Sequence, residues 1–174
     1  GDGSGLTGVS SVSSLNELTD SVFYNTDSGD YAGTILLGST IDENSTSSKY
    51  NSGVGKDALS SITSGARNVA FGYLSLSKVT SNNDNTAIGA FTLVNIIETA
   101  EGNSTLGSNS LNKNTTGSYN TANGYKSMYS NTTGGYNVSL GMESMFYNST
   151  GNFNTAIGYQ SLYCNNIQDG ISDK

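Results

Sequence analysis

Large apolar residues recur along this chain in a fixed relation to a glycine. The step from one such glycine to the next is constant, except that the step between Gly89 and Gly107 is longer by a single residue. The glycines are Gly38, Gly55, Gly72, Gly89, Gly107, Gly124, Gly141 and Gly158. Repetition at a nearly constant period of this length is the signature of a repeat protein. Positions are numbered below from this repeat glycine as position 0, and residues that share a position form a row.

Two rows carry most of the large apolar side chains. Row −1 contains Leu37, Val54, Phe71, Ile88, Leu106, Leu140 and Ile157, with Asn123 in the remaining copy. Row +4 contains Leu59, Leu76, Leu93, Leu111, Met128, Met145 and Leu162, with Asp42 in the first copy. We assign both rows to the structural core of the repeat or to a subunit interface, rather than to a cofactor site.

This pattern predicts an all-β protein, a parallel β-roll or β-solenoid of about eight coils, each of about 17 residues. Each coil is expected to hold two short strands, one ending at row −1 and one around row +4. The glycines would supply bends where φ is positive or where no side chain fits. A helical repeat is excluded because each copy is too short for a helix pair and no run keeps a helical period.

Asparagine occupies row −4 in seven copies. The residues are Asn51, Asn68, Asn85, Asn103, Asn120, Asn137 and Asn154. Coils stacked at the strand spacing of about 4.8 Å would place these side chains directly above one another. Each amide could then bond to the next, as in stacked in-register sheets. The row therefore predicts a structural asparagine ladder.

A second set of asparagines lies in Asn-x-Ser/Thr sequons. Asn114, Asn131 and Asn148 all stand at position +7, in a predicted outer bend. They are candidate glycosylation sites if the chain passes through a glycosylating route. The alternative is that Asn-Thr-Thr-Gly is simply favourable turn chemistry, and we favour this alternative.

Aromatic residues also share positions. They form three rows: Tyr73, Tyr125 and Tyr159 at +1, Tyr129, Phe146 and Tyr163 at +5, and Tyr119, Tyr136 and Phe153 at −5. Exposed rows of this kind could stack on the sugar rings of a host surface. We favour aromatic ladders that stabilise the stack of coils.

The chain divides into three parts. We assign residues 1–33 to a Gly/Ser-rich linker and lead-in hairpin, residues 34–168 to the β-roll repeats, and residues 169–174 to the start of a further segment or tail. The hairpin is predicted from the apolar runs 22–24 and 34–37 around a turn at 27–30. The chain begins without Met, and we expect it to be a segment of a longer fibre polypeptide.

Composition argues against catalysis. The chain has no histidine, which removes the usual general base, the Ser-His-Asp triad and most zinc sites. A net charge of −7 argues against nucleic acid as a partner. No apolar run reaches membrane length. We predict no catalytic residue, no cofactor and no metal site. Cys164 is the only cysteine; in a trimer it could meet its copies near the axis, but we favour a buried free thiol.

The clearest copies are Asn154-Thr155-Ala156-Ile157-Gly158-Tyr159-Gln160-Ser161-Leu162 and residues 117–134. This motif resembles the head repeats of YadA-like trimeric adhesins, which form a left-handed parallel β-roll. It resembles still more closely the longer Asn-Thr-Ala-Ile-Gly repeats of phage and large-virus trimeric fibre proteins. The resemblance covers about residues 34–168. It implies a homotrimer packed around a threefold axis and a role in attachment.

The resulting functional expectation is a non-enzymatic structural and attachment module of an extracellular trimeric fibre or adhesin. It would lie on a virion surface or a cell-surface appendage, with copies of itself, and a host-surface glycan or protein, as partners. The alternative is a monomeric β-solenoid that binds a regular surface such as ice or polysaccharide. Its candidate residues are the aligned Thr86, Thr121 and Thr155.

Overall fold

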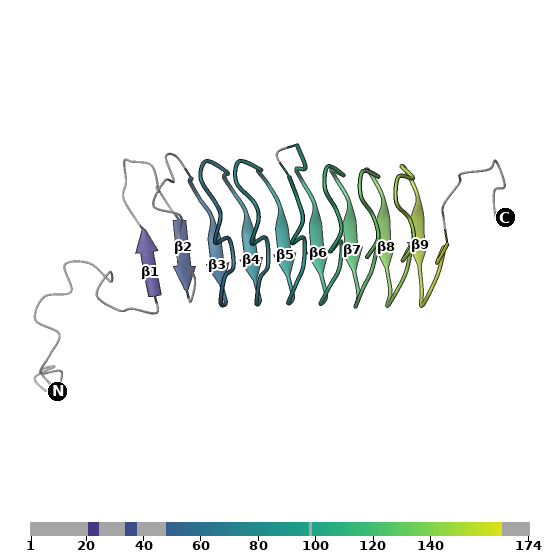
Figure 1. Cartoon of the computed structure of the whole chain (residues 1–174). Coiled ribbons are helices and arrows are strands. Elements are labelled where there is room, and N and C mark those ends of the chain that lie inside the picture. Colours follow the sequence, from purple (N-terminus) through teal and green to yellow (C-terminus); the bar gives the residue numbers. More distant parts are fainter. Residues whose placement is uncertain (1–20, 25–33, 38–47, 98, 165–174) are drawn as a thin grey trace, which may run out of the picture.

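The computed structural model describes residues 21–24, 34–37, 48–97 and 99–164. One sheet contains all of its strands in chain order, and Figure 1 shows them side by side in a single row. The strands are β1 (Ser21–Tyr24), β2 (Thr34–Leu37), β3 (Ser52–Val54), β4 (Val69–Phe71), β5 (Thr86–Ile88), β6 (Ser104–Leu106), β7 (Thr121–Asn123), β8 (Val138–Leu140) and β9 (Thr155–Ile157).

Pairing changes direction after the first two strands. β1 pairs antiparallel with β2, so the two apolar runs form the predicted hairpin ladder. From β2 to β9 every pair is parallel, and each residue faces the residue of the same row in the next coil, as Ala70 faces Ala87. The predicted fold class, an all-β parallel solenoid, is confirmed, with about six turns between β3 and β9.

The longer step between Gly89 and Gly107 leaves this register intact. β5 and β6 still align Ile88 with Leu106, and Asn103 still bonds to Asn85. The additional residue is therefore taken up between Ile88 and Asn103, on the part of the coil away from the strand. A strand pairs in register along its whole length, whereas a bend can lengthen without disturbing its neighbours.

Each coil in the described residues has one strand, not the predicted two. The residues after the glycine make consecutive turns, and positions +2 and +4 have left-handed backbones, as at Phe91 (φ 58°) and Leu93 (φ 51°). This conformation lets the N–H of Phe91 donate to Tyr73 O in the preceding coil and that of Leu93 donate to Ser110 O in the following coil. These bonds offset the cost of about 1–2 kcal/mol that a non-glycine residue incurs in the left-handed region.

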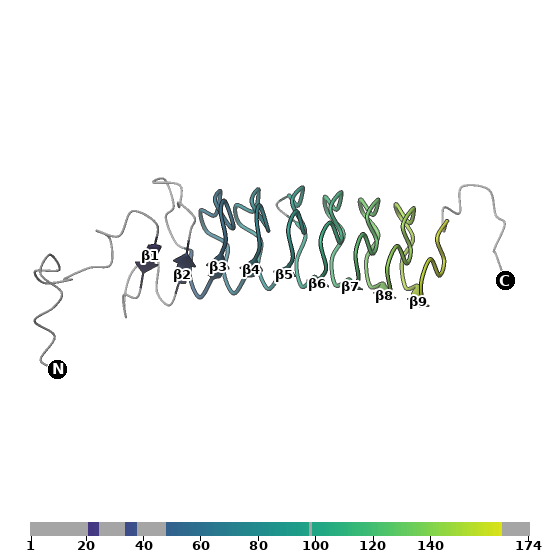
Figure 2. The same ribbon diagram turned by 90° about the horizontal axis from the view of Figure 1, so that it is seen from below.

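The core is narrow and comes from rows on both sides of the coil. Figure 2 shows the successive coils as thin loops. Row +4 is fully buried from Leu59 to Met145, whereas Leu162 in the last described coil is 38% exposed. Row −2 supplies the inward-facing residue of each strand, and it is small or hydroxylic in every described coil, as in Ala87, Ala122 and Ser139.

Row −1 does not lie in the core of the chain. Phe71, Ile88, Leu106 and Ile157 are between 38% and 71% exposed, and Val54 and Leu140 are partly exposed. Alternation along a strand explains this correction, because a three-residue strand with its middle residue inside must point the flanking residues outward. Of the two assignments that we made for this row, only a subunit interface is compatible with its exposure.

The repeat glycines stack so closely that no side chain fits between coils. A Cβ atom added to Gly107 would lie 2.5 Å from the carbonyl oxygen of Gly124. The described members of the row, from Gly55 to Gly158, have φ between 120° and 138°. Both constraints select glycine. Gly38, Asp42, the turn at 27–30, the linker and the tail lie outside the described residues.

Candidate interaction surface

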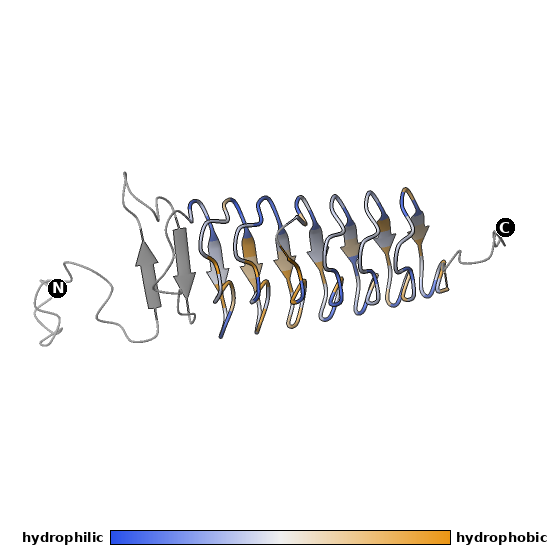
Figure 3. Cartoon of the chain, turned by 45° about the horizontal axis from the view of Figure 1, so that its top comes forward, coloured by the Kyte–Doolittle hydropathy of each residue, from blue (hydrophilic) through white to orange (hydrophobic). Residues whose placement is uncertain are grey.

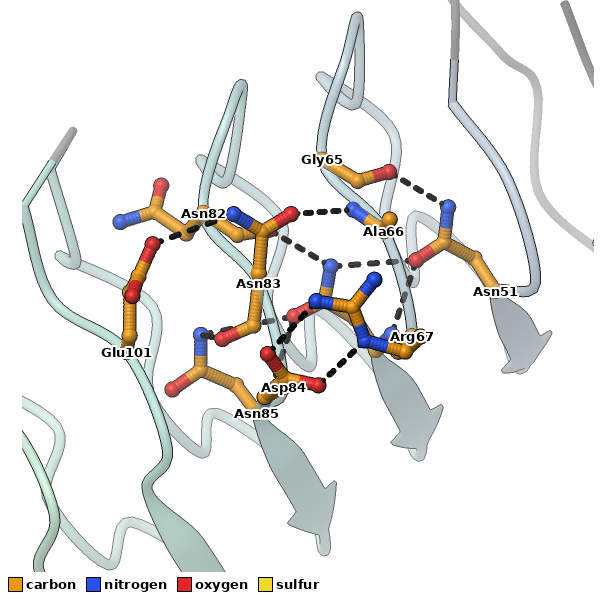
Figure 4. A network of polar contacts seen from close by, with 10 residues as sticks. Asn51, Gly65, Ala66, Arg67, Asn82, Asn83, Asp84, Asn85 and Glu101 are labelled. Carbon is orange, nitrogen blue, oxygen red and sulfur yellow. Dashed lines mark hydrogen bonds and ion pairs between the residues drawn. The ribbon is translucent and has the colours of Figure 1, made fainter.

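The asparagine row forms a continuous hydrogen-bonded ladder inside the solenoid. Figure 4 shows the part of it between Asn51 and Asn85. Asn120 Nδ2 donates to Asn103 Oδ1 at 3.1 Å and to Gly134 O at 2.9 Å. Asn120 Oδ1 in turn accepts from the backbone N–H and from Nδ2 of Asn137, at 3.1 and 3.0 Å. The same pattern extends from Asn51 to Asn154. From Asn68 to Asn137 the row therefore satisfies buried backbone groups, and its amides are occupied within the chain.

The three sequon asparagines at position +7 are inside the coil, not on an outer bend. Asn114, Asn131 and Asn148 are fully buried. Their Nδ2 atoms, which would carry the glycan, donate to the glycine carbonyl three residues later. The folded chain therefore has no room for glycosylation at this row, and turn chemistry accounts for the motif. Earlier coils fill the same row with buried Ile62, Val79 and Ile96.

Two aromatic rows form stacked ladders. At position −5 the rings of Tyr119, Tyr136 and Phe153 stack at centroid distances of 5.1 and 5.2 Å. At position +5 Tyr129, Phe146 and Tyr163 stack at 5.2 and 5.4 Å, and Lys113 Nζ lies 5.1 Å from the Tyr129 centroid. The ring faces are thus directed at one another, which supports the ladder interpretation over a platform for sugar rings.

The third aromatic row does not form a continuous ladder. Tyr73 packs edge-on against Phe91, a residue of row +2, and Tyr125 lies under Lys126 Nζ at 5.1 Å. Tyr159 is 67% exposed. Ala90 and Ser108 separate Tyr73 from Tyr125, and Met142 separates Tyr125 from Tyr159, so the rings of this row are too far apart along the stack to touch one another.

An ion pair interrupts the aromatic row at position −5. Arg67 donates from Nε to Asp84 Oδ1 at 2.6 Å and from Nη2 to Oδ2 at 2.8 Å. The hydrogen bond from Arg67 lowers the pKa of the Asp84 carboxyl below its ordinary value. Both side chains are about half exposed, so solvent screens the pair.

We expect Arg67→Gln to raise the pKa of Asp84, as followed by its carboxyl chemical shift in an NMR titration. Because the pKa of Asp84 is lower in the folded state than in the unfolded state, the ion pair stabilises the fold at pH values above the unfolded-state pKa. This stabilisation is lost as the pH falls through the folded-state pKa of Asp84. Stability at pH 7 should change little, and the difference between variant and wild type should disappear in strong acid. An unchanged Asp84 titration would show that the pair does not persist in solution.

The outward strand face is the one extended surface of the described chain that remains unexplained. We define it as rows −3 and −1 of strands β3 to β9. Hydrophobic residues recur along these strands (Figure 3). Row −3 contains Ser52, Val69, Thr86, Ser104, Thr121, Val138 and Thr155, all exposed or partly exposed. Row −1 adds a large apolar side chain in every described coil except that of β7, which has Asn123.

No charged residue lies on this face, although the chain as a whole carries a net charge of −7. A solvent-facing strand normally carries charged or polar residues. A contiguous exposed apolar patch on a soluble chain marks an interaction site. The signal available in the sequence was row −2, which is small in every described coil and therefore identifies the inward side of the strand.

The described residues contain no set of acidic, cysteine or histidine side chains arranged to hold a metal ion. They also include no helix with the length and apolarity needed to cross a membrane. Cys164 is exposed, so the expectation of a buried thiol is wrong.

A scan against protein-family models, a search of curated proteins and a search of solved structures each returned no match to this chain. The description of the fold and of the outward strand face therefore rests on the sequence and structure of this chain alone.

Proposed function

We propose that this chain is the structural and attachment module of an extracellular homotrimeric fibre or adhesin, on a virion or on a cell-surface appendage. In this proposal three copies pack their outward strand faces around a common axis, and the bends are left to contact a host-surface glycan or protein. The module is not an enzyme, and it needs no cofactor. The repeat resemblance described above suggested the trimer, and the outward strand face supplies a surface for it.

The observation that carries the proposal is the exposure of row −1. Phe71 is 56% and Leu106 is 48% exposed, in a row that is apolar in every described coil except the one with Asn123. Burying a large apolar side chain completely contributes about 1.5–3 kcal/mol. Six of the seven coils from β3 to β9 would bring such residues together along the axis, and the absence of charge lets identical faces approach without repulsion.

A thin core gives a second reason for association. Inside the coil, rows −4, −2 and +3 are mostly polar or small, so row +4 and part of row +7 supply nearly all of the large buried apolar side chains. Small cores commonly need oligomerisation as an additional source of buried area. A trimer would move row −1 from solvent into a second core shared between chains.

We expect Leu106→Glu to abolish the trimer, because three carboxylates would meet in an apolar layer near the middle of the interface. Association should weaken at least about 100-fold, and light scattering should report the mass of one chain. Thr133→Glu is the matched control. Thr133 is exposed in a bend away from the strand, and the substitution adds the same charge as Leu106→Glu. Its mass should remain that of three chains.

The proposal fails if the wild-type chain has the mass of one chain, measured with any natural C-terminal extension present. It also fails if Leu106→Glu remains a trimer. A monomer would favour the alternative, a solenoid that binds a regular surface. Thr86, Thr121 and Thr155 do lie on the outward strand face, but on alternate strands separated by Ser104 and Val138. A thermal-hysteresis assay would then decide whether that surface is ice.

A further inference from the structure

Asn123 is the one polar residue in row −1. It is exposed, and no other described residue hydrogen-bonds to its side chain. The neighbours of Asn123 in the sheet are Leu106 in β6 and Leu140 in β8, at the same register position. The asparagines of row −4, in contrast, bond to one another along the ladder, from Asn51 to Asn154. Asn123 is therefore not part of the asparagine ladder, and the fold of one chain gives no reason for an amide at this position.

An interface between copies does give such a reason. An amide has both donors and an acceptor, so an asparagine can bond to an identical asparagine facing it. Facing leucine instead, it would lose water without gaining a partner, which costs free energy. A single asparagine in an apolar seam is known to fix alignment and oligomeric state in coiled coils, at some cost in stability.

We propose that Asn123 sets the axial register in which copies of this chain associate. The inference rests on the proposed homotrimer. Row −1 repeats every coil, at about 4.8 Å. A slip of one coil would therefore still match apolar residues to apolar residues and would lose only one layer at each end. The same slip would place every Asn123 level with Leu106 or Leu140 of another copy, where its amide has no partner.

The test compares wild type with Asn123→Leu by native mass and by the amide NMR spectrum. Copies in register are related by symmetry, so each residue gives one resonance. Slipped copies are not equivalent, and they give additional resonances. We expect Asn123→Leu to keep the mass of the trimer, to bind its copies at least about ten-fold more tightly, and to raise the population of slipped registers at least about ten-fold. Since Asn123 is on the surface of the chain, the substitution leaves the coil intact.

The double variant Asn123→Leu with Leu106→Asn is the matched control. It moves the polar layer by one coil and keeps the composition of row −1, so it should restore a single set of resonances. A wild-type monomer would overturn the proposed trimer itself. A trimer whose Asn123→Leu variant keeps one set of resonances, or falls apart, would overturn only the register inference. Failure of the double variant to restore a single set would also overturn it, because the alignment would then depend on another feature.

Discussion

Gly107→Ala should open the solenoid between β6 and β7. The added Cβ would lie 2.5 Å from the carbonyl oxygen of Gly124 and 2.6 Å from its carbon, distances that force the two coils apart. The backbone of Gly107 also has φ of 136°, a region that an alanine adopts only under strain. We expect a loss of more than about 4 kcal/mol in the free energy of unfolding of the surrounding coils, because the clash is with backbone that is itself held by the next coil.

Gly158→Ala separates the two causes. Gly158 has a comparable φ of 120°, but an added Cβ there meets no atom within 4 Å. It should therefore suffer only the backbone strain, about 1–3 kcal/mol. The difference between the two variants measures the steric cost of stacking one coil on another.

Hydrogen exchange localises the damage. In the wild type the N–H of Gly124 donates to Leu106 O at 2.7 Å, and that of Lys126 donates to Ser108 O at 3.0 Å. Because each coil in a solenoid contacts only its neighbours, these amides should lose protection first in Gly107→Ala, while amides near β3 and β4 change less. Equal stability of the two alanine variants would show that coil stacking does not exclude a side chain at this row.

The features that the sequence predicted correctly depend on repetition or on local runs of apolar residues. Asn68 and Asn85 stand at the same position of successive copies and align in register, so a ladder follows from spacing alone. The hairpin of β1 and β2 likewise follows from local apolar runs. The ladder needs only the period and the parallel stacking, and the antiparallel hairpin needs only neighbouring apolar runs, so both can be predicted from one chain.

The second strand was predicted wrongly because its cause is not local. Leu76 and Leu93 have left-handed backbones, with φ of 51°, although leucine has no intrinsic preference for that region. The conformation is selected by hydrogen bonds to neighbouring coils, such as Leu76 N–H to Thr92 O at 3.1 Å. A periodic leucine therefore indicated burial correctly, and it carried no information about the backbone that buries it.

The direction of row −1 was missed for a different reason. Large apolar residues such as Phe71 and Ile88 suggest a core, and only the dimensions of the coil exclude them from it. Inside, Ala70 and Ala87 share one buried cluster with the row +4 leucines, and this narrow core has room only for a small residue at row −2. The same observation that corrected the prediction produced the candidate interface, because large residues excluded from one core are available for another.

Asn120→Asp should be among the most damaging substitutions that change no volume. Asn120 is fully buried, and its Nδ2 donates to two oxygens, Asn103 Oδ1 and Gly134 O. A carboxylate at this position would place an oxygen, in place of the amide nitrogen, next to Asn103 Oδ1 and Gly134 O. No hydrogen would be available to donate to either oxygen, and the site excludes water. We expect a loss of about 3–5 kcal/mol at pH 7, comparable to breaking a buried polar network by removal of one partner.

The pH dependence identifies the cause of that loss. Burial and the two facing oxygens favour the protonated carboxyl, so the pKa of the introduced aspartate should be raised in the folded state. A carboxyl whose pKa is raised in the folded state contributes its full stability below its unfolded-state pKa, near 4. That contribution is lost as the pH rises through its folded-state pKa. Urea unfolding of Asn120→Asp should therefore approach the wild-type curve at about pH 4 and diverge from it toward pH 7.

Asn152→Asp provides the control with the same change of charge. Asn152 is exposed, its Oδ1 accepts from the N–H of Gly135 at 2.7 Å, and a carboxylate keeps that acceptor. Its Nδ2 bond to Thr150 O is exposed to solvent, so water can replace it. The control should lose less than about 1 kcal/mol and show no divergence between pH 4 and pH 7. If both aspartates had the same effect, the loss would come from adding a negative charge to an already acidic chain. A loss confined to position 120 would instead mean that the donor capacity of the buried amides holds successive coils in register.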